Sequence, residues 1–137
     1  MRLWHEDLFT ELSKQRILGQ HREICGMRGA GWGQNHSTVN YVWDYRPVRL
    51  LIFHRRLMDI GGKRFGIKFT SEWFNPHYRG KNLGFDESDN WLTPSEEIDF
   101  ETDNGDPFPI YLEHDDEYLE ECVDNLQEKG IELEVEV

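Results

Sequence analysis

Three stretches of this chain carry apolar residues at the spacing of an amphipathic helix, and they limit the fold to a mainly α one. The first predicted helix covers residues 10–27 and the second covers residues 47–60. The third lies within residues 115–130, where the apolar stripe is clearest. We therefore predict a compact single domain, residues 1–137, of three helices joined by long irregular loops.

Residues at the predicted helix ends support these assignments. Thr10 suits the N-cap of the first helix, and Gly29 lies just beyond its end. Pro47 opens the second helix at a position where its missing N–H costs nothing. Gly61-Gly62 is expected to stop that helix, and Gly130 is expected to end the third.

The segments between the helices are less regular. Residues 29–46 are predicted to be mostly loop, with a short extended piece at residues 38–43. Residues 63–113 show little periodicity, and so long an irregular stretch leaves room for a short helix or hairpin. Residues 86–106 indicate an exposed acidic loop. Residues 131–137 alternate apolar and acidic side chains, as in an edge strand or an extended tail.

The charge of the chain is divided unevenly. Residues 1–83 hold 14 of the 15 Lys and Arg and seven acids, a net charge of +7, whereas residues 84–137 hold 20 acids and one Lys, a net charge of −19. A basic first part suits a phosphate-rich ligand such as DNA. The acidic part would repel that ligand, so it lies on the far side, pairs with the basic face or regulates access. Alternatively, the acids only keep the protein soluble.

Composition and the N-terminal residues exclude several classes of protein. The hydrophobic content of 37% and aromatic content of 13% favour a folded domain over disorder. No apolar run approaches the ~20 residues of a membrane span. Charged side chains among the first eight residues exclude a signal-peptide core. We expect Cys25 and Cys122 to be buried thiols in a reducing compartment, and the protein to be cytoplasmic.

Familiar metal, nucleotide and hydrolase signatures are absent. The six histidines show no spacing that suggests a metal site, and no cofactor motif is present. The glycine run at residues 29–33 follows a predicted helix instead of a strand, so it is no dinucleotide fingerprint. Ser37, His36 and Asp44 do not form a triad with a nucleophile elbow. The sequence therefore predicts neither metal nor cofactor.

The first helix presents an acidic residue in an unusual setting. One stripe of the helix carries residues at helical spacing: Ile17, His21, Ile24 and Arg28. Glu23 lies away from this stripe, between Gly19 and Gly26. Glycine inside a helix costs about 1 kcal/mol relative to alanine, so two of them suggest that a ligand or backbone approaches Glu23 closely. The alternative is an ordinary solvated surface acid.

The opening residues Met1-Arg2-Leu3-Trp4 and the run 18–24, Leu-Gly-Gln-His-Arg-Glu-Ile, resemble the pyrimidine dimer DNA glycosylase family. The resemblance is sharpest over residues 1–28 and fits the length of the chain. A well-known member of this family is a phage enzyme, endonuclease V, but residues 29–46 and 75–82 resemble a bacterial branch of the family more than that enzyme. The resemblance implies an endonuclease V-like fold.

The resemblance also implies a reaction mechanism. In this family the N-terminal α-amine attacks the sugar C1′, expels the base and forms a Schiff base, and β-elimination then cleaves the strand. The Met1 amine is the candidate nucleophile here, with Glu23 and Arg22 as the supporting catalytic residues. Arg22 would lower the pKa of the amine, and Glu23 would steady the cationic sugar or move protons.

Further residues are candidates for contacts with DNA or with a displaced base: Arg2, His21, Arg28, His36, Asn40, Arg79 and Lys81. Core packing is the alternative for the aromatic residues near them, and a solvated loop is the alternative for Arg79 and Lys81. The expected partner is double-stranded DNA with a damaged base or an abasic site, bound by a monomer. A different damaged base, or a non-catalytic DNA- or protein-binding module on the same fold, are the other interpretations.

Overall fold

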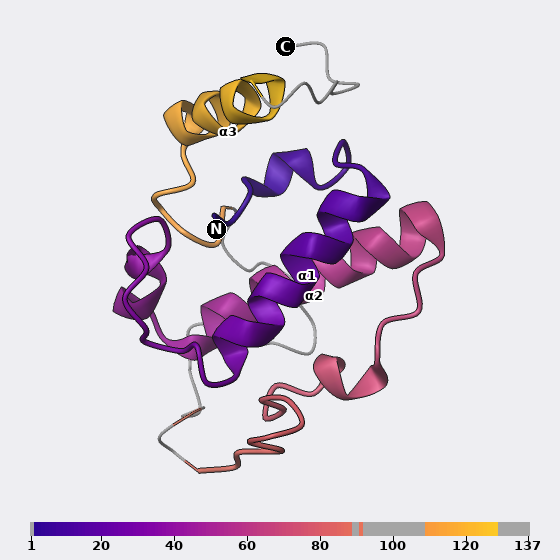
Figure 1. Ribbon diagram of the computed structural model, residues 1–137, viewed down its shortest axis with the longest axis vertical. Helices are drawn as coiled ribbons and strands as arrows, with labels where there is room; N and C mark the ends of the chain where they lie inside the picture. The colour runs from indigo at the N-terminus through magenta and orange to yellow at the C-terminus, as the bar shows by residue number, and fades with distance from the viewer. Residues whose placement is uncertain (1, 89–90, 92–108, 129–137) are drawn as a thin grey trace.

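The computed structural model describes residues 2–88, 91 and 109–128 (Figure 1). Over these residues the helices are α1 (Lys14–Arg28), α2 (Pro47–Phe65) and α3 (Asp116–Glu128), with the short 3-10 helices η1 (Glu6–Leu8), η2 (Asn40–Asp44) and η3 (Ser71–Phe74). None of the described residues lies in a β-strand, so the predicted mainly α fold is confirmed. The endonuclease V-like arrangement stays a prediction.

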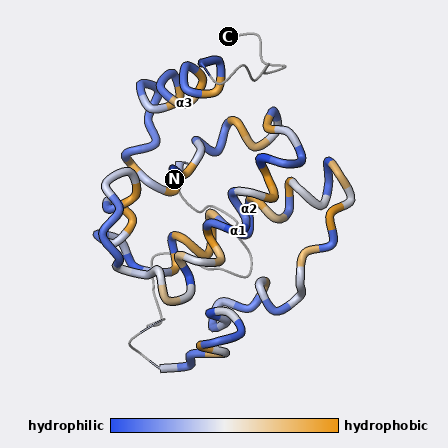
Figure 2. Tube along the Cα trace, in the orientation of Figure 1, coloured by the Kyte–Doolittle hydropathy of each residue, from blue (hydrophilic) through white to orange (hydrophobic). Residues whose placement is uncertain are grey.

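Helices α1 and α2 pack against each other at the centre of the molecule. Residues 2–13, here the N-terminal segment, lie between this pair and α3 (Figure 1). Hydrophobic residues recur at intervals along both central helices, whereas α3 is mostly hydrophilic with apolar residues interspersed (Figure 2). Side chains from all these elements form one core: Leu3, Leu8, Phe9, Ile17, Ile24, Leu51, Phe53, Tyr111, Cys122 and Leu126. The start of the chain is therefore part of the core, which restricts where its backbone can lie.

Helix α1 begins later than predicted. Ser13 is its N-cap, since the Ser13 hydroxyl oxygen accepts a backbone N–H of the first turn at 3.2 Å. Thr10 instead donates its hydroxyl to a carbonyl of the preceding turn, so the predicted cap was wrong. The residues before Ser13 turn inward because Phe9 and Leu12 are buried. The predicted C-terminal glycine, Gly29, is the C-cap.

Helix α2 starts at Pro47 as predicted but continues through Gly61-Gly62 to Phe65. The residue that ends it is Gly66, whose φ of 66° is the left-handed conformation that favours glycine. The prediction that Gly61-Gly62 stops the helix was therefore wrong.

Gly61 has a packing role within α2. A Cβ built at this position would lie 2.9 Å from Cζ of Phe69 and 3.0 Å from Cγ2 of Ile17. Glycine thus lets α2 approach α1 and the segment that follows α2. Close packing outweighs the cost of glycine inside a helix, and this close contact cannot be inferred from the local sequence.

The intervening segments also differ from expectation. The predicted extended piece at residues 38–43 is wrong, because Asn40–Asp44 form η2 and bury Val39 and Val42 on the core. Residues 63–113 do contain a short helix, η3, and an isolated antiparallel bridge between Tyr78 and Phe85. Both are too short to produce a periodic sequence pattern.

Helix α3 agrees with the prediction, with acids in its first turn and Cys122, Val123 and Leu126 buried. Most of the predicted acidic loop at residues 86–106 and all of the tail at residues 131–137 lie outside the described residues. Both cysteines are free, with Cys122 buried and Cys25 half-buried. In the described part of the chain, no helix combines the length and apolar character that a membrane span requires.

Candidate functional site

A buried glutamine joins the start of the chain to Glu23. Gln20, on α1, is 1% exposed. Its Oε1 accepts the backbone N–H of Trp4 at 2.6 Å, and its Nε2 donates to the carbonyl of Arg2 at 3.0 Å and to Oε2 of Glu23 at 3.1 Å. The amide therefore uses its acceptor and both donor hydrogens. These bonds hold the backbone of residues 2–4 beside the Glu23 carboxylate.

Residues of α3 and of the loop before it contact the N-terminal segment from the other side. The Tyr118 hydroxyl donates to the carbonyl of Leu3, and Arg2 Nη1 lies 3.3 Å from Oε1 of Glu121. The His114 ring stacks on Tyr118 with centroids 4.7 Å apart. This part of the acidic third therefore pairs with the N-terminal segment, one of the arrangements considered from the charge distribution.

Glu23 is an exposed residue whose carboxylate is partly covered where it meets Gln20, and it lies between two glycines of α1. A Cβ at Gly26 would meet nothing within 4 Å, and one at Gly19 would meet only the end of Arg22 at 3.9 Å. Neither glycine is thus required by packing, and both leave space around the carboxylate. Burial raises the pKa of the Glu23 carboxyl, against the Gln20 hydrogen bond and the charges of Arg16 and Arg22, which lower it. A carboxyl with a raised pKa is suited to proton transfer near neutral pH.

Arg22 and Glu23 stand between two clefts and line both. The first, here the polar cleft, has a volume of about 760 Å³, and its walls include Arg2, Gln15, Arg16 and Gln20. The second, here the apolar cleft, has a volume of about 780 Å³, and its walls include Met27, Val39, Trp43, Trp73 and Leu83. Arg2 and Arg16 thus lie on one side of the Arg22-Glu23 pair, and the other side combines aromatic and aliphatic side chains with Arg79 and Lys81.

The structure brings several of the predicted DNA contacts to these clefts. Arg2 lines the polar cleft, and His36, Arg79 and Lys81 line the apolar cleft together with Glu23. Asn40 lines neither cleft, and its Oδ1 accepts the backbone N–H of His36 at 2.7 Å. Met1 lies outside the described residues.

Arg28 lies in the interior and lines neither cleft, although its guanidinium packs against Trp73 in the wall of the apolar cleft. It is 0% exposed, and its guanidinium donates to the carbonyls of Trp73 at 2.8 Å, Asn75 at 2.8 Å and Tyr78 at 2.9 Å. Burial lowers its pKa to about 10, so it remains charged at neutral pH. Arg28 therefore holds the segment after η3 against α1. The DNA contacts proposed below do not include it.

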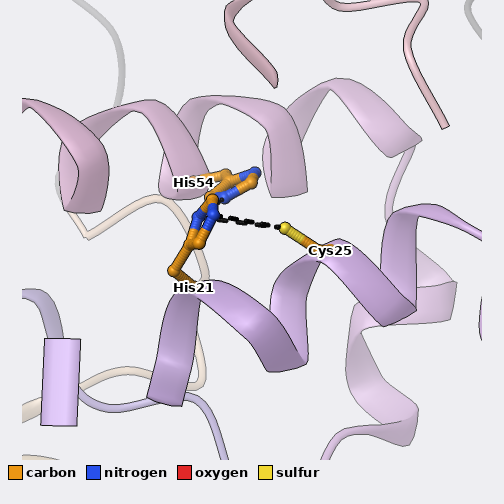
Figure 3. A group of neighbouring side chains, drawn as sticks. All are labelled: His21, Cys25 and His54. Atoms are coloured by element: carbon orange, nitrogen blue, oxygen red, sulfur yellow. Dashed lines mark hydrogen bonds between the residues drawn. The ribbon is translucent and has the colours of Figure 1, made fainter. Parts of the chain in front are cut away.

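His21, the remaining candidate, faces His54 and Cys25 inside the molecule (Figure 3). His21 Nδ1 lies 2.8 Å from Nε2 of His54, and Cys25 Sγ lies 3.6 Å from Nε2 of His21. Burial, with the charges of Arg28 and Arg22, lowers the pKa of His21 to about 4. His21 is therefore neutral at pH 7. The cluster was missed from the sequence, although the i, i+4 spacing of His21 and Cys25 is a usable signal.

The hydrogen bonds of this cluster decide whether it suits a metal ion. The ligand atoms of His21, Cys25 and His54 lie within 4.8 Å of one another. Arg28 Nη1, which can only donate, lies 3.0 Å from Nδ1 of His54. Nε2 of His54 must then carry the proton of the neutral ring and donate it to His21. Both His54 nitrogens are occupied, so the cluster fits a hydrogen-bonded chain better than a metal site.

Comparison with known proteins identifies the family. A sequence model of the family described as pyrimidine dimer DNA glycosylase matches residues 1–75, more than half of the chain. Comparison with curated proteins and with solved structures gives no match. The matched residues include the N-terminal segment, Gln20, Arg22 and Glu23, whereas α3 lies beyond them. The chain therefore belongs to the pyrimidine dimer DNA glycosylase family.

Proposed function

We propose that this protein is a DNA repair glycosylase with abasic-site lyase activity, and that the α-amine of Met1 is its nucleophile. The observation that carries the proposal is the Gln20 amide, which binds the Arg2 carbonyl and the Glu23 carboxylate at once. Residue 1 is covalently attached to Arg2, so its amine can lie at most about 7 Å, the reach of two residues, from this carbonyl. We therefore propose that the amine reacts beside the Glu23 carboxylate and the clefts that Glu23 lines.

The proposed reaction proceeds in two stages. The neutral amine attacks the sugar C1′, the bond from C1′ to the damaged base breaks, and opening of the sugar ring leaves a protonated imine. A base then removes a proton from C2′, the electron pair forms the C2′–C3′ double bond, and the C3′–O bond to the phosphate breaks. Hydrolysis of the imine releases the amine. An α-amine has an ordinary pKa near 7.7–8.0, so part of it is neutral at pH 7.

Glu23 and Arg22 have complementary roles in this scheme. The Glu23 carboxyl, whose pKa burial raises, exchanges protons with the base or the sugar and, when ionised, stabilises the cationic imine. The positive charge of Arg22 favours the neutral form of the amine and offers a contact for a phosphate.

The two clefts are suited to different parts of a damaged duplex. The cations of the polar cleft, Arg2, Arg16 and Arg22, suit the phosphate backbone. The apolar cleft, with Trp43 and Trp73 in its walls, suits a base turned out of the stack. A pyrimidine dimer is the substrate that the family suggests, and another damaged base is the alternative.

The test uses protein with a free Met1 amine and two duplexes, one with a cyclobutane pyrimidine dimer and one with an abasic site, both with EDTA present. We expect strand cleavage of both, lost when the amine is acetylated and reduced by about two orders of magnitude or more in Glu23→Gln. Glu120→Gln, an exposed acid on α3, is the matched control and should cleave like the wild type. Binding of both duplexes without cleavage would instead favour the non-catalytic module.

A further inference from the structure

The turn between Tyr78 and Phe85 is tightly specified. These two residues form an antiparallel bridge, and within it Arg79 N donates to the Gly84 carbonyl at 2.8 Å and Gly84 N donates to the Gly80 carbonyl at 2.7 Å. Gly80 and Gly84 have φ values of 96° and 63°, which residues other than glycine rarely adopt. This segment, here the 78–85 turn, therefore has a defined backbone.

The 78–85 turn is fastened to the end of α1. Arg79 Nε donates to the carbonyl of Arg28 at 2.8 Å, and its Nη2 donates to the carbonyl of Gly29 at 3.2 Å. The Arg79 guanidinium also lies 4.1 Å from the ring centroid of Trp91 and pairs with Asp86 at 3.3 Å. The turn is thus held in a fixed position relative to the helix that carries Glu23.

The tip of this turn presents an apolar side chain to solvent. Leu83 is 47% exposed and is preceded by Lys81 and Asn82, which are also exposed. All three line the apolar cleft, as does Glu23. A half-exposed leucine leaves much of its apolar surface in water, and burying that surface against a ligand would be favourable. The 78–85 turn therefore holds an exposed leucine, Leu83, and a nearby lysine, Lys81, in the cleft that Glu23 lines.

We propose that Leu83 is a wedge that enters the base stack of duplex DNA and fills the gap left by the displaced nucleotide. The inference rests on the proposed function, because displacement is needed only if the protein acts on a base within a duplex. Leucine is among the apolar side chains that proteins insert between base steps, at a cost in unstacking that the new contacts repay. Lys81 would contact an adjacent phosphate and set the depth of insertion.

The first test compares cleavage of one abasic strand in a duplex and as a single strand. Leu83→Ala should slow cleavage of the duplex about tenfold, a loss of about 1.4 kcal/mol of transition-state stabilisation, and leave the single strand unaffected. Leu83→Met, which keeps an apolar side chain of similar volume, should restore most of the duplex rate. Leu112→Ala is the matched control, since Leu112 is 78% exposed and lines neither cleft.

The second test measures unstacking directly, with 2-aminopurine placed next to the abasic site in the duplex. Wild-type protein should raise the 2-aminopurine fluorescence on binding, and Leu83→Ala should raise it much less. Equal fluorescence with both proteins, or equal loss of cleavage on both substrates, would overturn the wedge. If the wild type cleaved neither substrate, the proposed function would fail, and the fluorescence measurement would still decide the role of Leu83.

Discussion

Replacing Gln20 by leucine tests whether one buried amide holds the start of the chain at Glu23. The substitution keeps the side-chain volume roughly constant and removes all three hydrogen bonds, those with Trp4 N–H, the Arg2 carbonyl and the Glu23 carboxylate. Its effect is therefore on polar contacts and not on core volume.

The magnitude follows from the burial of each partner. The Trp4 N–H bond to Gln20 is fully buried, so the N–H is left without an acceptor, at a cost of about 1–3 kcal/mol. The Arg2 carbonyl and the Glu23 carboxylate are partly exposed and can be hydrated, so each adds about 0.5 kcal/mol. We expect Gln20→Leu to lower the free energy of unfolding by about 2–4 kcal/mol.

Two assays separate the effects on stability and on chemistry. Urea unfolding gives the change in free energy, and borohydride trapping on an abasic duplex below the unfolding transition gives the rate of imine formation. Gln20→Glu is the informative partner variant: it keeps an acceptor for Trp4 N–H, loses both donors and places a second carboxylate beside Glu23. We expect both variants to trap at least tenfold more slowly. Gln20→Leu with unchanged stability and an unchanged trapping rate would refute the reasoning.

Three further predictions concern the interior. Arg28→Met should lower the free energy of unfolding by about 3 kcal/mol or more, because three carbonyls lose their donor; a change under about 1 kcal/mol in urea unfolding would contradict this. Gly61→Ala should lower the free energy of unfolding by about 1–3 kcal/mol, because the added Cβ overpacks the core. Gly62→Ala, whose Cβ has only an ordinary contact at 3.6 Å, should be neutral or slightly stabilising. Equal effects of the two variants in thermal unfolding would be inconsistent with the packing described. Burial lowers the pKa of His21 from 6.5 to about 4, so between these pH values the unfolded chain binds a proton that the folded protein does not bind. The free energy of unfolding should therefore fall as the pH falls from about 6.5 to 4. In His21→Gln it should fall less steeply over the same range.

The helices could be predicted from the sequence because their signals are local. Apolar spacing located all three, and Pro47 and Gly29 marked helix ends correctly. The errors arose where a tertiary contact overrode a local preference. Gly61 is a breaker by propensity, but it lies inside α2 because Ile17 and Phe69 need the space. Thr10 is a suitable cap, but burial of the neighbouring Phe9 turns the chain before the helix begins.

The candidate site was only partly predictable for the same reason. Glu23 is a candidate from the sequence because glycines on either side of an acid are a local anomaly, and the resemblance of the surrounding sequence to a known family supports it. Gln20 gave no such signal, since its partners Trp4 and Arg2 lie 16 and 18 residues away. Arg28 was misleading, because a basic residue on a helix looks the same in sequence whether it binds a phosphate or three buried carbonyls. Leu83 was not identified, since exposure at the tip of a turn is a property of the fold.

The most direct measurement is to locate the atom that bonds to DNA. Protein with an unblocked N-terminus is incubated with the abasic duplex and borohydride, the adduct is digested, and the modified peptide is identified by mass spectrometry. The account predicts that the sugar is attached to the α-amine of Met1. An adduct on a lysine side chain, such as that of Lys81, or no adduct from folded protein that binds the duplex, would contradict it.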